Sequence, residues 1–272
     1  MIQDRRILTG LEHSQYEHPF DKKALENLES SKLLTKFFKF LTKHTVERIY
    51  TVQYTGSNLK ISNKNYPQIH QYLEYACEIL DLPMVPDLYI NWDYRIDAFT
   101  VGAENPIIIL SSGLIDLCND DEIMFIIGHE VGHIKSNHML YHMMAQVINF
   151  VVDMIPGGTI FAGGFQFLLY YWYRMSEFTA DRAGLLCCQN PEAVASAFIK
   201  MAGLPLKEFD NIRTETFLQQ ARDFKMLDYD GMNKVVKLLS IADQTHPWTV
   251  MRSAELLKWI ESGEYNKFVP QR

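Results

Sequence analysis

Residues 128–133 read GHEVGH, and this stretch decides the fold because it sets two histidines four residues apart with a glutamate beside the first. On an α-helix, four residues turn the chain by about 400°, so His129 and His133 lie about 40° apart on one face. Two imidazoles in this arrangement can reach one metal ion. Glu130 follows His129 by about 100°, beside the ion, which suits a base that acts on a metal-bound water.

The alternative is a pair of core histidines hydrogen-bonded to carbonyls, with Glu130 in a salt bridge. Gly128 and Gly132 favour the metal site. Each costs about 1 kcal/mol relative to alanine in a helix interior, so a helix keeps them where another backbone or a ligand comes close.

The surrounding sequence places the GHEVGH stretch in the middle of a helix. The pattern is helical from about Asp120 to His142, with a cap among residues 119–121 and Glu122 in the first turn. His138 repeats the four-residue spacing with His142, but on one continuous helix the pair lies about 180° to 220° from His129. We therefore expect both of these histidines on the polar face.

A third ligand is required, because two imidazoles leave a catalytic zinc one protein ligand short. The stretch SEFTADRAG, residues 176–184, supplies candidates, since Glu177 and Asp181 share one face of a helix. Ala180 and Gly184 are small enough to let that helix press against the first. Glu177 can complete a His2Glu site, and Asp181 can orient a ligand imidazole. A solvated acidic face is the alternative for this stretch.

The rest of the chain predicts a mostly helical α+β fold. Helical spacing covers residues 21–47 and 66–81, and short apolar pieces between Asp87 and Leu110 predict a small sheet of three or four strands. We expect an N-terminal helical extension over 1–65 and one catalytic domain over 66–272.

Composition limits the partners and the compartment. The 26 Lys and Arg against 33 Asp and Glu give a net charge of -7 with no basic run, which makes nucleic acid an unexpected partner. The four cysteines form no C-x-x-C pair, and the first residues hold no apolar run of signal-peptide length. We expect a cytoplasmic protein.

Asp153 is the only charged residue in the largely apolar stretch 143–173, which raises the question of a membrane contact. Spanning a bilayer takes about 20 continuous apolar residues, whereas Pro156, Gly157 and Gly158 divide this stretch into shorter arms. We therefore expect a helical hairpin beside the cleft that acts as a lid, a partner surface or a shallow membrane contact.

The combination of H-E-x-x-H with E-x-x-x-D-R-x-G resembles the HtpX and CAAX-prenyl-protease family of gluzincin metallopeptidases, metallopeptidase family forty-eight. The resemblance covers roughly Tyr66 to the C-terminus. It implies a zincin fold with one zinc per chain, held by His129, His133 and Glu177. It also implies that Glu130 is the general base and that Asp181 anchors a ligand.

Two further stretches are similar to family elements. DAFTVG, residues 97–102, resembles an edge strand that binds substrate backbone by strand addition, which implies Ala98, Phe99 and Thr100 as substrate-binding residues. Asp97 stands where the family usually has Asn.

THPWTVMR, residues 245–252, resembles a late H-P-x-x-x-x-R element. It implies that His246 reaches the active site, as an oxyanion stabiliser or a resting-state zinc ligand, and that Arg252 organises the site. A plain helix start at Pro247 is the alternative.

These observations predict a zinc endopeptidase that hydrolyses extended or unfolded polypeptides. The competing hypothesis is a catalytically weak, chaperone-like or partner-binding module that retains the zinc site. Glu130 argues against that hypothesis, because a purely structural site does not need it. No oligomeric state follows from the sequence.

Overall fold

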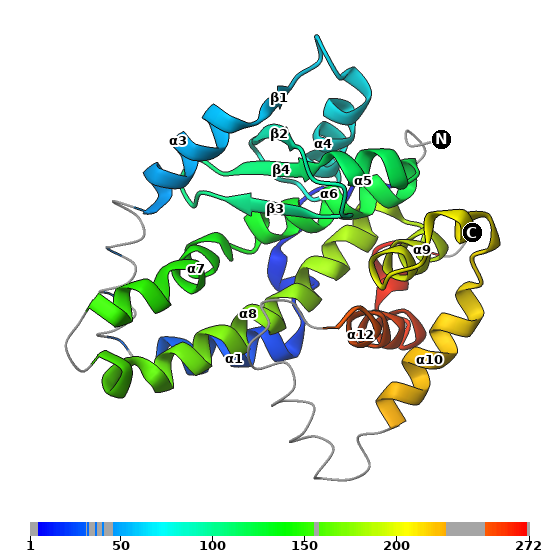
Figure 1. The fold of residues 1–272 in the computed structure, drawn as a ribbon. Helices are drawn as coiled ribbons and strands as arrows, with labels where there is room; N and C mark the ends of the chain where they lie inside the picture. The colour runs from blue at the N-terminus through cyan, green and yellow to red at the C-terminus, as the bar shows by residue number, and fades with distance from the viewer. Residues whose placement is uncertain are drawn as a thin grey trace.

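The computed structural model describes residues 5–30, 32, 36, 40, 46–154, 158–226 and 248–270. Helices dominate, and they surround one small sheet (Figure 1). The helices are α1 Pro19–Glu29, α3 Glu47–Ser57, α4 Pro67–Ile79, α5 Ser112–Leu117, α6 Asp120–Lys135, α7 Met139–Met154, α8 Gly158–Cys188, α9 Pro191–Met201, α10 Thr214–Met226 and α12 Thr249–Glu261. Short 3-10 helices span His13–Gln15, Leu206–Asn211 and Tyr265–Lys267. This is the mostly helical α+β architecture that the sequence predicts.

Within the described ranges, the sheet has four strands in the order β1-β2-β4-β3. They span Leu59–Ile61, Asp87–Asn91, Ala98–Val101 and Ile107–Ser111, from β1 to β4. Strand β4 is central and fully buried, pairing parallel with β2 and antiparallel with β3. Strand β3 therefore forms one edge of the sheet, next to helix α6, as Figure 1 shows.

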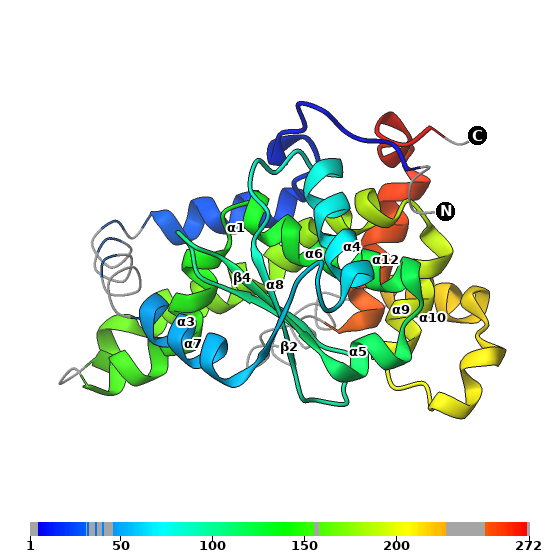
Figure 2. The same cartoon turned by 90° about the horizontal axis from the view of Figure 1, so that it is seen from above.

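Residues alternate between the two faces of β4 because side chains of a strand point to opposite sides in turn. Ile108 and Leu110 join the main core with α4 and α6, whereas Ile107 and Ile109 pack toward Tyr50 and Tyr54 of α3. Helix α3 thus covers the face of the sheet that α6 leaves open (Figures 1 and 2).

Helices α6 and α8 form the centre of the molecule and touch along glycine-rich faces. A Cβ on Gly132 would lie 2.4 Å from the Cβ of Ala183, and one on Gly128 would lie 2.4 Å from the Cβ of Cys187. Any side chain at either glycine would push the helices apart. The close backbone approach that these glycines predict is therefore confirmed.

The expected continuous helix from Asp120 to His142 is wrong. Helix α6 ends at Lys135, and Asn137 adopts a positive φ of 57° before α7 begins at Met139. Asparagine tolerates this left-handed conformation, which commonly terminates helices. The turn reverses the direction of the next helix and brings His138 and His142 inward, where both are buried instead of lying on a polar face.

The apolar stretch 143–173 is divided between α7 and α8, whose side chains share a core cluster with α1. Helix α8 continues from this stretch without a break into SEFTADRAG, so one element carries both (Figure 1). None of the described helices combines enough length with a sufficiently apolar run to cross a membrane.

The described elements among the first 65 residues contact the remainder closely. Helix α1 packs along α8, and β1 completes the sheet by pairing with β2. Of the helix expected over 21–47, α1 covers the beginning, and most of residues 31–45 lie outside the described residues. The boundary at residue 65 stays a prediction.

Candidate active site

Helix α6 begins at a capping box that fixes its register. The side chain of Asn119 accepts hydrogen bonds from the backbone N–H groups of Asp121 and Glu122, and Glu122 accepts one from the N–H of Asn119. Such reciprocal bonds satisfy donors that a helix start leaves free. The helix then presents His129 and His133 on one buried face.

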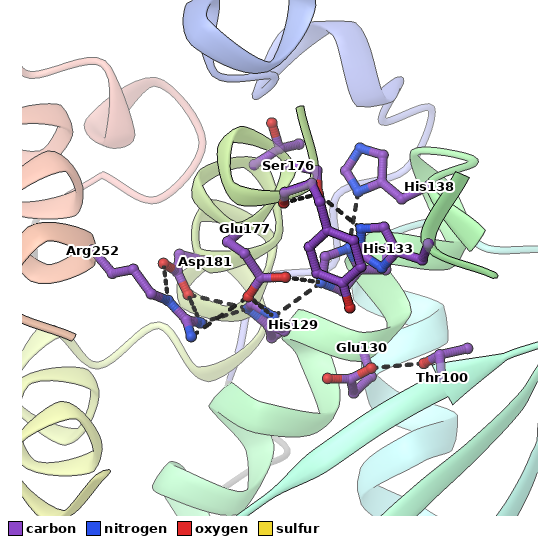
Figure 3. A network of polar contacts seen from close by, with 12 residues as sticks. Thr100, His129, Glu130, His133, His138, Ser176, Glu177, Asp181 and Arg252 are labelled. Atoms are coloured by element: carbon purple, nitrogen blue, oxygen red, sulfur yellow. Dashed lines mark hydrogen bonds and ion pairs between the residues drawn. The ribbon is translucent and has the colours of Figure 1, made fainter. Parts of the chain in front are cut away.

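Helix α8 places Glu177 opposite the two histidines (Figure 3). Its Oε2 lies 3.4 Å from Nε2 of His129, and its Oε1 lies 3.4 Å from Nε2 of His133. The two Nε2 atoms are themselves 3.0 Å apart. The three residues that the sequence marks as ligands therefore converge on one point.

The Nδ1 atoms of both imidazoles already have polar partners. Nδ1 of His129 lies 3.1 Å from Oδ1 of Asp181, and Nδ1 of His133 lies 2.9 Å from Nδ1 of His138. Arg252 from α12 donates two hydrogen bonds to Asp181, from Nε to Oδ2 at 2.9 Å and from Nη2 to Oδ1 at 2.5 Å. Asp181 thus orients one imidazole while being held itself, as second-layer carboxylates do at metal sites.

The donor set fits a zinc ion. When each Nδ1 carries its hydrogen, both Nε2 atoms present lone pairs to one point that the Glu177 carboxylate also faces. Three acceptors in this arrangement need a cation between them. Two histidines and one glutamate are a common catalytic zinc set, which keeps a fourth position for water or substrate.

The charges of the two imidazoles differ. Burial lowers the pKa of His133 to about 3 despite Glu177, so this ring is neutral at pH 7, as a metal ligand must be. Burial alone would lower the pKa of His129 as well, but its bonds to Asp181 and Glu177 raise it to about 9. Metal binding must release that proton, which makes metal affinity fall in acid.

Glu130 lies beside the three convergent groups and faces β3 (Figure 3). Its Oε2 accepts a hydrogen bond of 2.7 Å from the hydroxyl of Thr100. Burial raises the pKa of Glu130 to about 7, although the nearby His129 and the Thr100 bond oppose this shift. A carboxylate with a pKa near the working pH is well suited to accept a proton and to return it.

A cleft opens in front of these groups and is lined from both sides. Residues 96–100, which include most of β3, form one wall, and Tyr173 and Glu177 of α8 form another. His142 also reaches it, with its ring stacked on Tyr173 at a centroid distance of 3.8 Å. Arg252 of α12 also lines the cleft.

The structure thus brings together nearly all of the residues singled out from the sequence. Ala98, Phe99 and Thr100 line the cleft with the residues of α6, α8 and α12, whereas His246 lies outside the described residues. Sequence reasoning missed the bond from Thr100 to Glu130 and the inward position of His138. The Ser136-Asn137 pair was the available signal for His138, because both residues favour helix ends.

Comparisons with known proteins agree with this geometry. The sequence model of peptidase family M48 matches residues 63–260. The plastoglobule-localized metallopeptidase 48 of Arabidopsis thaliana, a chloroplastic protein, is 29% identical over 266 residues, which cover 97% of this chain and 77% of that protein.

Bacterial and archaeal proteases are similar over shorter lengths. An HtpX homolog of Salinibacter ruber is 27% identical over 162 residues, covering 52% of this chain and 58% of that protein. A second HtpX homolog, from Methanosarcina acetivorans, is 24% identical over 238 residues, covering 75% of this chain and 76% of that protein. No solved structure matches the chain.

Proposed function

The chain belongs to peptidase family M48 and is a metalloprotease, and from this premise we propose that it is a zinc endopeptidase that cleaves extended polypeptides. The observation that carries the proposal is the convergence of His129, His133 and Glu177, within 3.4 Å of one another, beside a buried Glu130.

We assign His129, His133 and Glu177 as the ligands of one zinc per chain. Bound zinc supplies a Lewis acid that polarises the scissile carbonyl and lowers the pKa of a water molecule. The protein contributes a rigid frame, because the ligands come from two helices that pack at glycine contacts. Arg252 and Asp181 hold His129 in one orientation, which limits the reorganisation needed on binding.

Glu130 is the proposed general base. Thr100 holds Oε2 of its carboxylate, which leaves Oε1 to accept a proton from the attacking water. Because burial raises the pKa of Glu130 above its ordinary value, the same oxygen can then give the proton to the nitrogen of the leaving amine. His246 remains the candidate from the late H-P-x-x-x-x-R element for stabilising the oxyanion or for a resting-state zinc ligand.

Edge strand β3 is the proposed platform for the substrate backbone. The N–H of Ser111 donates to the carbonyl of Asp97, and the register pairs Ala98 with Leu110 and Thr100 with Ile108. Alternation in an antiparallel pair then directs the N–H and C=O groups of Ala98 and Thr100 away from β4. Phe99 points to the other face, where its ring lies 5.1 Å from Tyr54, so it supports the strand.

This mode of binding reads main chain more than side chains, so it favours extended or unfolded polypeptides. Strand addition at an edge that already lies beside Glu130 places the scissile bond near the base. The proposed substrate class follows from this placement and not from any specificity pocket.

The test compares Glu130→Gln with Glu177→Ala on unfolded casein, alongside zinc content by mass spectrometry. Glu130→Gln should keep about one zinc per chain and lose about 10²- to 10⁴-fold in cleavage. Glu177→Ala should lose both zinc and cleavage, because two imidazoles alone hold zinc weakly. Full zinc occupancy in Glu177→Ala would overturn the ligand assignment, and retained cleavage in Glu130→Gln would remove Glu130 as the base.

A further inference from the structure

His138 is a buried imidazole that the proposed reaction does not use. Only 3% of its surface is exposed, and it lies just after the turn that separates α6 from α7. Polar groups buried to this degree are nearly always hydrogen-bonded, so its partners indicate its role.

Both ring nitrogens of His138 have a partner. Nδ1 lies 2.9 Å from Nδ1 of His133, and Nε2 lies 3.1 Å from Oδ2 of Asp21 on α1. The same oxygen of Asp21 accepts a 2.6 Å bond from the hydroxyl of Thr179 on α8. Thr179 in turn accepts a bond from the backbone N–H of His18, which caps α1. Figure 3 shows His138 meeting His133 on the side opposite Glu177.

One assignment of hydrogens satisfies the whole series. Nε2 of His133 faces Glu177 and His129, so its Nδ1 must carry the hydrogen when Nε2 binds a metal. Nδ1 of His138 then accepts, and its Nε2–H donates to Asp21. Burial would raise the pKa of Asp21, but the interaction with His138 and the hydrogen bond from Thr179 lower it below its ordinary value. Asp21 is therefore an ionised acceptor at the end of the series.

We infer that His138 and Asp21 are positioning residues for the metal ligand His133, and that the N-terminal segment thereby completes the metal site. The inference rests on the proposed function. Asp181 orients His129 directly, whereas His133 is oriented by a carboxylate acting through a second imidazole. Asp21 lies outside residues 63–260, the part of the chain that the family model matches.

A second metal ion between His133, His138 and His142 is the competing interpretation. One nitrogen of each lies within 4.8 Å of the others. However, Nε2 of His142 lies 2.9 Å from the hydroxyl of Ser176, and Nε2 of His138 is directed to Asp21. His133 would also have to bind two ions at once and lose both of its ring hydrogens. The hydrogen-bond series requires neither of these conditions.

The experiment measures zinc affinity of the full-length protein by competition with a chromophoric chelator, together with the melting temperature of the metal-free form. Asp21→Asn keeps the volume but removes the charged acceptor, and His138→Ala removes the intermediate ring. We expect each variant to bind zinc about 10- to 100-fold more weakly, which is the usual effect of losing a group that orients a ligand. The double variant should be no worse than His138→Ala, because the two residues act in series.

Glu255→Gln is the matched control. Glu255 holds the same N-terminal segment through a 3.3 Å contact with His18, away from His133. If Asp21 serves only to dock α1, Glu255→Gln should weaken zinc binding as Asp21→Asn does. Affinity within twofold of wild type in Asp21→Asn would overturn the inference even if His138→Ala fails to fold. Where His138→Ala folds, additive losses in the double variant would overturn it as well.

Two outcomes separate this inference from the proposed function. Two zinc ions per wild-type chain, one of them lost in His138→Ala, would favour the second metal site and overturn the positioning role. Unchanged zinc binding in Glu177→Ala would contradict the ligand assignment itself. Loss of zinc in Glu177→Ala with normal affinity in Asp21→Asn would leave the proposed function intact and reject the inference alone.

Discussion

The hydroxyl of Thr100 donates a 2.7 Å hydrogen bond to Oε2 of Glu130, so the proposed substrate strand touches the proposed base. The bond stabilises the ionised carboxylate and is one of the contacts that hold the pKa of Glu130 down against burial. Strand position and base strength are therefore linked through one side chain.

Thr100→Val removes this bond with little change of shape, and we expect the pKa of Glu130 to rise further above its ordinary range. The base is active only when ionised, so the acid limb of kcat/KM against pH should move to higher pH. A bound cation lowers the pKa of Glu130 in the wild type and in Thr100→Val alike, so the prediction concerns the difference between the two pH profiles. Thr100→Ser keeps the hydroxyl and should retain the wild-type profile. If the acid limbs of Thr100→Val and wild type superimpose, Thr100 does not control the pKa of Glu130.

Local sequence patterns were sufficient for the groups that share a helix. Two four-residue spacings predict which side chains meet at the site: His129 with His133, and Glu177 with Asp181. The small residues beside them predict the helix contact that joins the two pairs. Such spacings work because helix geometry fixes which side chains share a face. The short strands between Asp87 and Leu110 and a cap among residues 119–121 follow from local signals in the same way, whereas the edge position of residues 97–102 was implied by the family resemblance.

Contacts between distant segments could not be predicted in this way. Helical periodicity continues through Ser136 and Asn137, so a single left-handed residue was enough to reverse the position of His138. Asp21 reaches His138 only because α1 packs along α8, and no periodicity in either segment encodes that packing. The missing information lies in tertiary packing, which overrides local propensity.

Arg252→Met should destabilise the protein strongly. Arg252 is buried and forms a two-point contact with the buried Asp181, so its removal takes the guanidinium from a buried carboxylate and leaves that carboxylate dependent on the imidazole of His129. Breaking such a pair from one side costs about 3–5 kcal/mol, whereas an exposed pair is worth about 0–1 kcal/mol. Arg222→Met, which breaks the exposed contact with Glu261, is the control. Urea unfolding of both variants checks the prediction, and equal losses would contradict it.

Gly132→Ala should separate α6 from α8. The new Cβ would lie 2.4 Å from that of Ala183, and overpacking of this kind costs about 1–3 kcal/mol, more than the helix propensity that alanine adds. Because the ligands come from both helices, zinc affinity should fall as well. Gly164→Ala on α8 meets no atom within 4 Å and should stabilise the protein slightly. Calorimetry with and without zinc measures both effects, and a stabilised Gly132→Ala would refute the contact argument.

Ala98→Pro tests whether β3 binds the substrate backbone. The N–H of Ala98 points to the open edge, so proline removes a donor for the substrate without removing a bond to β4. Proline is tolerated on edge strands for this reason.

We expect kcat/KM on casein to fall by about tenfold, the effect of losing about one hydrogen bond, while zinc content stays at the wild-type level. Ala98→Gly is the control, because it loosens the strand but keeps the N–H, and it should lose less activity than Ala98→Pro. Wild-type cleavage by Ala98→Pro at full zinc occupancy would show that this N–H does not contact the substrate. An equal loss in both variants would mean that strand rigidity matters and not the donor. Since β3 also positions Thr100 against Glu130, the acid limb of the pH profile must be unchanged in Ala98→Pro for a loss to be assigned to substrate binding.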